Sequence, residues 1–299
     1  MVGRFQARSG ARVGVVSDNG AGQEGDWLRR GRRARNALAE TWGALAEVSS
    51  GLSEAEWALP TECPGWDVKD QVSHLIGIER AIMGEPVPEW SGPLGDHVKN
   101  DFAATNEPFV AVRRALLGPS VRAEFVEVTT TRLAQLDALT AEGWAAVGYS
   151  PLGDVPHAEF MAVRVFDSWV HEQDVRRALD RPGGDGNTAS EISLDHVQRA
   201  MPYVVGKLAG CADGTAVLFD VTGAGHDARA FTIAVDGGRA RPVGDETAPT
   251  VTLSLSSIDF MRLGCGRTTS TLLQPTRAVG VDGDGLAGAS VLGAMNFMF

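Results

Sequence analysis

The sequence predicts a bundle of α-helices followed by a small α+β domain, because the spacing of its apolar residues changes once along the chain. From about Trp27 to Leu179, apolar side chains recur every three or four residues, which is typical of amphipathic helices. From about Thr215 onward they alternate with polar side chains, which is typical of β-strands. A chain of 299 residues is also long enough for two domains.

Composition divides the chain into three segments. Residues 1–25 are rich in glycine and arginine and contain one aromatic side chain, so we expect a flexible tail there. Residues 26–184 should form the helical bundle, which ends at the turn-forming run Arg181-Pro182-Gly183-Gly184. Residues 185–299 should form the small α+β domain.

The first two long helices carry clear end signals. An amphipathic helix with apolar residues at positions 38, 42, 45 and 48 should end near Gly51. Ser53 and Glu56 are three residues apart and predict a capping box for a short helical turn. Asp67 is the expected N-cap of a second long helix, which should end at Gly84.

Two further helices and a break between them complete the predicted bundle. Apolar residues from Val98 to Leu116 predict a helix, which Pro108 should kink or divide. Gly118 separates it from a helical run between residues 121 and 136. The last helix should extend from about Pro156 to Leu179. Four main helices with short connections predict a four-helix bundle.

The second domain should begin with a flexible segment from Gly184 to Ser190 and a helix over about 194–208. The Asp236-Gly237 pair predicts a hairpin turn between strands. The remaining expected elements are strands at 215–221, 229–235, 250–255 and 278–281, a short helix at 258–263 and a C-terminal helix at 286–297.

Charge and composition exclude several protein classes. The chain has 27 basic and 38 acidic residues, a net charge of −11. Residues 1–36 carry eight arginines against three acidic residues, so the rest of the chain sums to −16, and we expect no nucleic-acid partner. No apolar run approaches the roughly 18 residues of a membrane span, so we expect no membrane partner. Three cysteines without a C-x-x-C pair fit the reducing cytoplasm.

The strongest functional signal is a charged stripe on the last bundle helix. Residues 160–170 are apolar almost all the way round, yet four polar side chains fall within an arc of about 80°: Arg164, Asp167, His171 and Asp174. Charges on a buried helix are costly unless they are paired, hydrogen-bonded or bound to a metal. The spacing is compatible with a metal site on Asp167 and His171, with a ladder of salt bridges, or with a solvated face.

A metal site would need a third ligand from another helix, and His74 is the natural candidate. It lies about 140° from the centre of the apolar stripe on its own helix, so it is not a core residue of that face. The alternative is that His74 points into water. Two histidines and one carboxylate would leave a coordination position open on zinc or a similar ion, as catalysis requires.

The other candidates for chemistry are weaker. Cys63 and Cys265 have no base beside them in the sequence, which makes either one a poor nucleophile. The four remaining histidines lie at element ends or in loops, where we expect surface positions: His97, His157, His196 and His226.

Two separated motifs resemble one known family. The run Thr61-Glu62-Cys63-Pro64-Gly65-Trp66-Asp67-Val68, followed by Val72-Ser73-His74-Leu75, is similar to the C-P-G-W and helix-histidine signature of the mycothiol-dependent maleylpyruvate isomerase family, one of the DinB-like metal-binding bundles. Residues 167–176 resemble its last-helix motif, W-V-H-E-Q-D followed by a basic pair. The resemblance covers about residues 30–180. Residues 190–299 resemble, through weaker motifs, the C-terminal domain of these proteins, which is similar to sterol carrier protein type 2.

The resemblance implies a ligand set for one divalent metal, expected to be zinc: His74, Asp167 and His171. The characterised isomerase has glutamate where this chain has Asp167, which is one methylene shorter. The side chain should still reach a metal, but the coordination geometry would change. The resemblance therefore leaves the exact reaction open.

The resemblance also implies that an arginine from the C-terminal domain holds an acidic substrate. Arg262 and Arg267 are the candidates. We take Arg267, together with Arg164 of the charged stripe, as the candidate catalytic residues.

As a whole, the resemblance implies a cytoplasmic enzyme with mycothiol or a similar low-molecular-weight thiol as co-substrate. A divalent metal would lower the pKa of that thiol, whose thiolate would attack a small electrophile. Isomerisation of a maleylpyruvate-like diacid or S-transfer would result. A different class of function is a non-catalytic module that carries an apolar ligand in the C-terminal domain. A third is a regulator in which the charged stripe is only a salt-bridge network.

Overall fold

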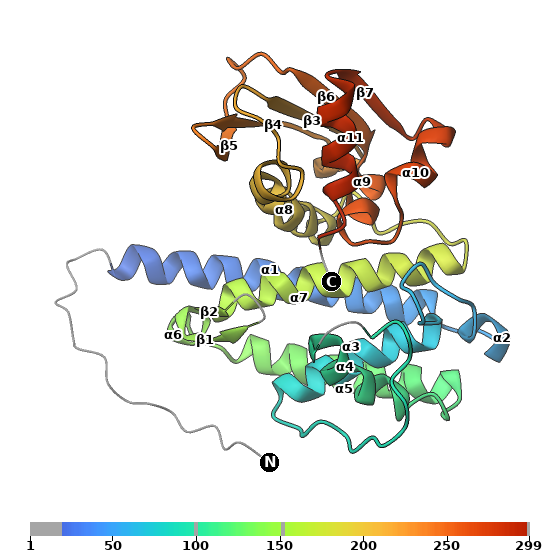
Figure 1. Cartoon of the computed structure of the whole chain (residues 1–299). Helices are drawn as coiled ribbons and strands as arrows, with labels where there is room; N and C mark the ends of the chain where they lie inside the picture. Colours follow the sequence, from blue (N-terminus) through green and yellow to red (C-terminus); the bar gives the residue numbers. More distant parts are fainter. Residues whose placement is uncertain (1–19, 99–100, 151–152, 298–299) are drawn as a thin grey trace.

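The computed structural model describes residues 20–98, 101–150 and 153–297, and it has two halves (Figure 1). The N-terminal half is helical, and the C-terminal half is built around a mixed five-stranded sheet. The predicted fold class is therefore confirmed. The long helices α7 (His157–Ala178) and α1 (Gly20–Val48) lie side by side, with the rest of the bundle on one side and α8 (Thr188–Tyr203) on the other.

The bundle is held together by the apolar stripes of its long helices. Leu38 and Leu45 are fully buried, and Trp42 Nε1 donates a hydrogen bond to Ser168 Oγ at 3.0 Å, which joins the first helix to α7. The long helices besides α7 are α1 (Gly20–Val48), α3 (Val68–Ile82) and α5 (Gly118–Asp137). The connecting elements are α2 (Glu54–Trp57), α4 (Asp101–Ala111), α6 (Ala141–Ala145), β1 (Val147–Ser150) and β2 (Gly153–Pro156).

Helix α1 begins earlier than the sequence predicts. It starts at Gly20, inside the segment expected to be a flexible tail, and residues 1–19 of that segment lie outside the described residues. Asp26 pairs with Arg29 at 3.0 Å and with Arg30 at 2.8 Å. These pairs, three and four residues apart, support helical structure that the glycine content alone would disfavour.

The helix predicted over 98–116 is shorter than expected. It ends at Ala111, and Pro108 lies inside it without dividing it. A proline so close to a helix end removes one backbone hydrogen bond and leaves the turns before it intact. The antiparallel strands β1 and β2 were not predicted, because each has only four residues and both contain glycine.

The C-terminal sheet has the strand order β5-β4-β3-β6-β7. β3 pairs with β6 in parallel, and the other neighbours pair antiparallel. Asp236 pairs with Arg239 across the predicted hairpin turn. The strands are β3 (Ala216–Thr222), β4 (Arg229–Asp236), β5 (Arg239–Val243), β6 (Val251–Ser256) and β7 (Val279–Gly283).

The helices of this half cover the sheet and dock it on the bundle. α8 begins inside the segment expected to be flexible, because the side chain of Asn187 caps it by accepting from the Ser190 amide. Pro202 lacks an N–H, and the chain continues as a π-helical turn over Val204–Leu208. The other elements are α9 (Ser257–Gly264), α10 (Ser270–Leu273), α11 (Gly285–Ala294) and 3₁₀ turns at Gly225–Asp227 and Gln274–Thr276.

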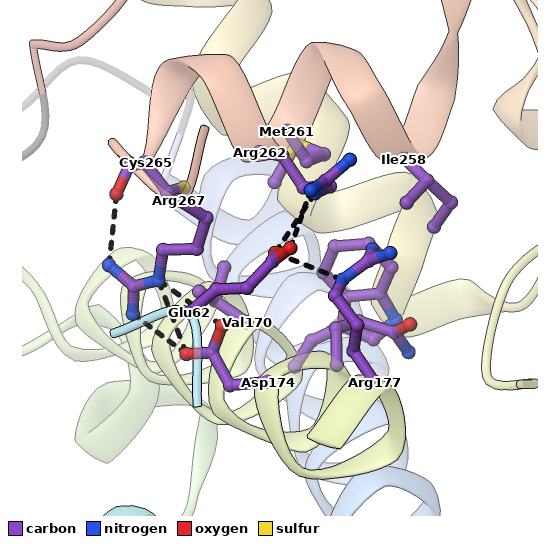
Figure 2. A pocket seen from close by; sticks show the side chains of 11 residues that line it. Glu62, Val170, Asp174, Arg177, Ile258, Met261, Arg262, Cys265 and Arg267 are labelled. Atoms are coloured by element: carbon purple, nitrogen blue, oxygen red, sulfur yellow. Dashed lines mark hydrogen bonds and ion pairs between the residues drawn. The ribbon is translucent and has the colours of Figure 1, made fainter. Parts of the chain in front are cut away.

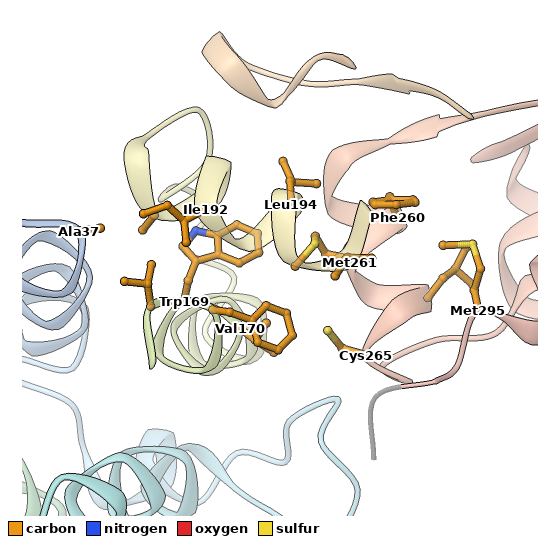
Figure 3. Close-up of a cluster of buried hydrophobic side chains, with 14 of the residues drawn as sticks. Ala37, Trp169, Val170, Ile192, Leu194, Phe260, Met261, Cys265 and Met295 are labelled. Carbon is orange, nitrogen blue, oxygen red and sulfur yellow. The ribbon is translucent and has the colours of Figure 1, made fainter. Parts of the chain in front are cut away.

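One continuous hydrophobic core crosses from the bundle into the C-terminal half. Figure 3 shows the crossing, where Trp169 and Val170 of α7 lie between α1 and the helices of the second half. Other buried side chains in this view are Ala37, Ile192, Leu194, Phe260, Met261, Cys265 and Met295. The second half is therefore packed directly against the helix that carries the charged stripe.

Candidate metal centre

The structure brings together three side chains that the sequence singled out. His74 of α3 and Asp167 and His171 of α7 each offer a ligand atom, and these atoms lie within 4.8 Å of one another. His74 Nε2 is 3.4 Å from Asp167 Oδ2, and His171 Nε2 is 3.6 Å from Asp167 Oδ1. Both histidines are buried, and 26% of the Asp167 side chain is exposed. His74 therefore faces the bundle interior, and the alternatives of a solvent-facing His74 and a solvated stripe are wrong.

The start of α3 is fixed by a short loop before it. The backbone of Pro60 bridges to that of Asp67, whose side chain caps α3 by accepting from the Asp70 amide at 2.8 Å. His74 lies two turns further along the helix. Gln71, one turn before His74, is fully buried and faces α7 through its contact with His171.

The ring of His171 is oriented from its far side. The side-chain amide oxygen of Gln71, Oε1, contacts His171 Nδ1 closely, and Asp174 Oδ2 lies 3.5 Å from the same nitrogen. Gln71 Nε2 donates to Thr61 Oγ1 at 2.6 Å, which leaves the amide oxygen for His171. Two acceptors at Nδ1 favour a proton on that nitrogen, while Nε2 is the nitrogen that faces Asp167 and His74.

A buried network of charges fixes Asp167. Arg164 Nη1 donates to Asp167 Oδ2 at 2.5 Å, and Arg164 Nε donates to Glu79 Oε1 at 2.8 Å. Arg132 Nε donates to the other oxygen of Glu79 at 3.1 Å. Arg164, Arg132 and Glu79 are all buried. The stripe thus includes the predicted ion pairs, and Arg164 reaches Asp167 directly.

Electrostatics separate the protonation states of the three candidate ligands. Burial lowers the pKa of His74 to about 4, so this imidazole is neutral at pH 7. Burial also opposes charge on the other two. The Arg164 charge nevertheless keeps the pKa of Asp167 well below its usual range, and the Asp167 hydrogen bond and charge raise the pKa of His171.

The Trp66 indole covers the two histidine rings. Its ring centroid is 5.0 Å from that of His74 and 5.8 Å from that of His171, and its Nε1 donates to Glu107 Oε2 at 3.3 Å. Gly65 before it has a φ of +81°, and a Cβ there would lie 2.4 Å from Nδ1 of His97. The glycine of the C-P-G-W motif is therefore required both by the turn and by this close approach.

The four other histidines lie outside the cluster, but only His226 is exposed as the sequence predicts. His97 is 3.0 Å from the buried Glu107 and packs edge-on to Trp66, so it belongs to the surroundings of the site. His196 stacks on Phe166, and His157 lies against Trp144 and Phe160. Aromatic neighbours partly cover these rings, which sequence position alone could not predict.

The two candidate arginines of the second half meet the bundle at a small cleft beside the site. Figure 2 shows Arg267 on Asp174, and Arg262 on Glu62. Glu62 also accepts from Arg177 Nε at 3.0 Å. Arg267 thus reaches the charged stripe at Asp174, and Arg262 reaches the loop before α3.

The cysteines near this cleft are poor nucleophiles. Burial raises the pKa of the Cys63 thiol to about 11 and that of Cys265 to about 12. Both therefore remain protonated at neutral pH, in agreement with the expectation from the sequence.

The fold and the cluster define a helical-bundle protein with a buried His-Asp-His cluster, joined to an α+β domain. Residues 38–176 match a family model described as the mycothiol maleylpyruvate isomerase N-terminal domain. This part of the chain is therefore similar to that domain family, which confirms the resemblance seen in the two motifs.

Two solved structures are similar to the chain. One is a crystal structure of the mycothiol-dependent maleylpyruvate isomerase, with 17% sequence identity and a TM-score of 0.48. The other is a histidine-to-alanine mutant of that enzyme, with 16% identity and the same TM-score. Each alignment covers 86% of this chain and 92% of the other. No curated protein matches the sequence. Among the described residues, no helix has the length and apolar character needed to cross a membrane.

Proposed function

We propose that this protein is a metal-dependent enzyme with a low-molecular-weight thiol, mycothiol, as co-substrate. The observation that carries the proposal is the convergence of His74, Asp167 and His171 inside a domain of the mycothiol maleylpyruvate isomerase family. Its substrate is a small electrophile. The reaction is isomerisation of a maleylpyruvate-like diacid or S-transfer to the electrophile.

The residues of the cluster suit a zinc ion. Imidazole nitrogens and a carboxylate oxygen are common zinc ligands, and three of them leave a position open for a substrate. Nε2 of His171 is available because Nδ1 already has acceptors on Gln71 and Asp174. His74 Nδ1 is buried without a hydrogen-bond partner among the described residues, while Nε2 of the same ring faces Asp167. The second oxygen of Asp167, Oδ1, lies 3.5 Å from His74 Nε2 and 3.6 Å from His171 Nε2, so it faces the same place from α7.

A bound zinc ion would supply positive charge that lowers the pKa of a thiol beside it. The protein would hold the site in shape. Arg164 keeps Asp167 charged and in position, and Glu79 in turn holds Arg164. Trp66 covers the two imidazoles and limits the access of water from its side. A dry, pre-arranged site strengthens electrostatic interactions with a thiolate.

The thiol comes from a co-substrate, because the thiols of Cys63 and Cys265 stay protonated. In isomerisation, the thiolate sulfur adds to one carbon of a cis double bond, and the resulting single bond rotates. Elimination of the same thiolate restores the double bond in the trans form, so the thiol is not consumed. In S-transfer, the sulfur–carbon bond persists and the electrophile loses its leaving group.

The apolar-carrier alternative has no comparable support. It requires side chains of the C-terminal helix to line a cavity. Val291, Leu292 and Met295 are instead buried within the hydrophobic core. Their place in the core explains their apolar character without a ligand.

Metal content and thiol ionisation test the proposal together. We expect one zinc per chain in the wild-type protein after equilibration with zinc, and ultraviolet absorption of a thiolate when mycothiol is added. His171→Ala should lose both signals. His196→Ala is the matched control, because His196 is a partly buried histidine that stacks on Phe166 outside the cluster, and it should retain both. A wild-type protein without stoichiometric metal would contradict the proposal.

A further inference from the structure

We propose that Arg267 is a positioning residue, which holds Asp174 against His171 from the second half of the protein and so sets the metal affinity of the site. The inference rests on the proposed function in one respect, since it takes His171 as a metal ligand. All the candidate ligands lie in the bundle, and in this proposal the docking of the C-terminal half directly affects their metal affinity.

The contacts form a continuous chain. Arg267 Nη2 donates to Asp174 Oδ2 at 2.8 Å, and Arg267 Nε lies 3.2 Å from both oxygens of that carboxylate (Figure 2). The same Asp174 Oδ2 is 3.5 Å from His171 Nδ1. Arg267 itself is held by a third bond, from Nη1 to the backbone oxygen of Cys265 at 2.9 Å. All three donor nitrogens of the guanidinium therefore point at protein acceptors.

Burial makes the Asp174 charge depend on Arg267. The exposed fractions of the two side chains are 3% and 12%, so neither charge is well solvated. A buried carboxylate needs a cation or hydrogen-bond donors to remain charged. The other two arginines of the cleft, Arg177 and Arg262, are bound to Glu62.

The position of Asp174 beside His171 explains how Arg267 would affect metal binding. A carboxylate on the far nitrogen of a ligating histidine fixes the ring and makes its other nitrogen a stronger donor. Loss of such a partner typically weakens metal binding by about 10- to 100-fold. Without Arg267, the Asp174 carboxylate would lose the three contacts that hold it toward His171, and His171 would keep only the Gln71 oxygen as a fixed acceptor.

Arg267→Gln and the matched control Arg262→Gln test this role. Both arginines belong to the same segment of the second half and each pairs with a bundle carboxylate, but Arg262 has no contact with the stripe. Cobalt(II) and zinc would be titrated into the metal-free proteins in competition with a chromophoric chelator. We expect a dissociation constant about 10- to 100-fold higher for Arg267→Gln and a change below about threefold for Arg262→Gln. Arg267→Lys should restore part of the affinity. The absorption spectrum of bound cobalt should change in Arg267→Gln, which alters the surroundings of His171, and should stay the same in Arg262→Gln.

A double-mutant cycle with Asp174→Asn guards against a general loss of folding. If Arg267 acts through Asp174, the double variant should bind metal no more weakly than Asp174→Asn alone. Equal loss in both arginine variants, additive losses in the cycle, or unchanged affinity in Arg267→Gln would overturn the inference. Failure of the wild-type protein to bind cobalt or zinc would instead overturn the proposed function, and this inference with it.

Discussion

The two halves of the molecule treat buried charge in opposite ways. The bundle places Glu79, Arg132 and Arg164 in its interior, and each forms an ion pair within it. The C-terminal half packs the rings of Phe219, Phe231 and Phe260 against one another. Among the described residues of that half, Asp227 is the one buried residue with a charged side chain.

This difference supports the proposal that the bundle carries the chemistry. Burial of an ion pair is costly, and such pairs add little stability compared with apolar side chains of the same size. Buried ionisable groups with perturbed environments cluster at functional sites. The network of the bundle ends at Asp167, whereas the aromatic cluster of the sheet ends at no polar group.

Making the bundle resemble the other half should have the largest effect on function. Replacement of both Asp167 and His171 by leucine should abolish metal binding, because two of three ligands are lost. Stability of the metal-free protein should fall, because buried Arg164 loses one of its two carboxylate partners and keeps only Glu79. Metal analysis and urea unfolding measure the two effects. A double variant that still binds one zinc per chain would show that the ligands lie elsewhere.

Breaking the charge network from inside should cost stability as well as affinity. Glu79→Gln would leave Arg132 and Arg164 buried without their shared carboxylate. We expect a loss of about 3 to 5 kcal/mol in the free energy of unfolding. Asp167 should also move as Arg164 loses its anchor, so zinc affinity should fall. Unchanged affinity would mean that Arg164 does not position Asp167.

An equally buried change in the apolar half should leave the metal centre alone. Phe219→Ala removes the ring that stacks on Phe231 at 4.9 Å, and it should cost about 3 to 4 kcal/mol. Zinc affinity at a temperature where the variant is folded should match that of the wild-type protein. A weaker zinc site in this variant would contradict the division of roles between the halves.

One of the buried carboxylates on α7, that of Glu172, should give a smaller, pH-dependent effect on stability. Glu172 is fully buried, with Arg176 on one oxygen and no partner for the other among the described residues. Burial raises its pKa to about 7 from 4.5, so the folded protein keeps a proton that the unfolded chain releases. Stability from this group should therefore fall as pH rises from about 4.5 to about 7, and then level off.

Glu172→Gln removes that titration. Its stability relative to the wild-type protein should grow across this pH range, by on the order of 1 to 3 kcal/mol above pH 7. Urea unfolding of both proteins at several pH values would measure the difference. A difference independent of pH would show that the carboxyl group is charged throughout.

Local rules predicted much of the fold and the core of the site. The spacing of Arg164, Asp167, His171 and Asp174 is a property of one helix, so the stripe could be identified without tertiary information. The N-cap at Asp67 and the box at Ser53 likewise depend on neighbours within three residues. The four-residue strands and the Asn187 cap were not predicted, because such short elements give weak sequence signals.

The partners of the site could not be predicted, because they come from distant parts of the chain. Gln71 lies one turn before His74, and this spacing was the one signal that could have identified it. Nothing local links Glu79 to Arg164, which are 85 residues apart. The sequence suggested that Arg267 meets the substrate, and only the packing of the halves reveals its bond to Asp174. Tertiary docking decides such contacts.

Helix α7 packs against both halves of the protein, which limits how the chain could be cut into separate fragments. One side of the helix carries the candidate ligands, while Trp169 and Val170 on another side lie in the core that runs into the C-terminal half. A fragment cut after Gly184 would uncover that apolar side to water and lose the arginine that faces Asp174. The two halves should therefore melt in a single cooperative transition.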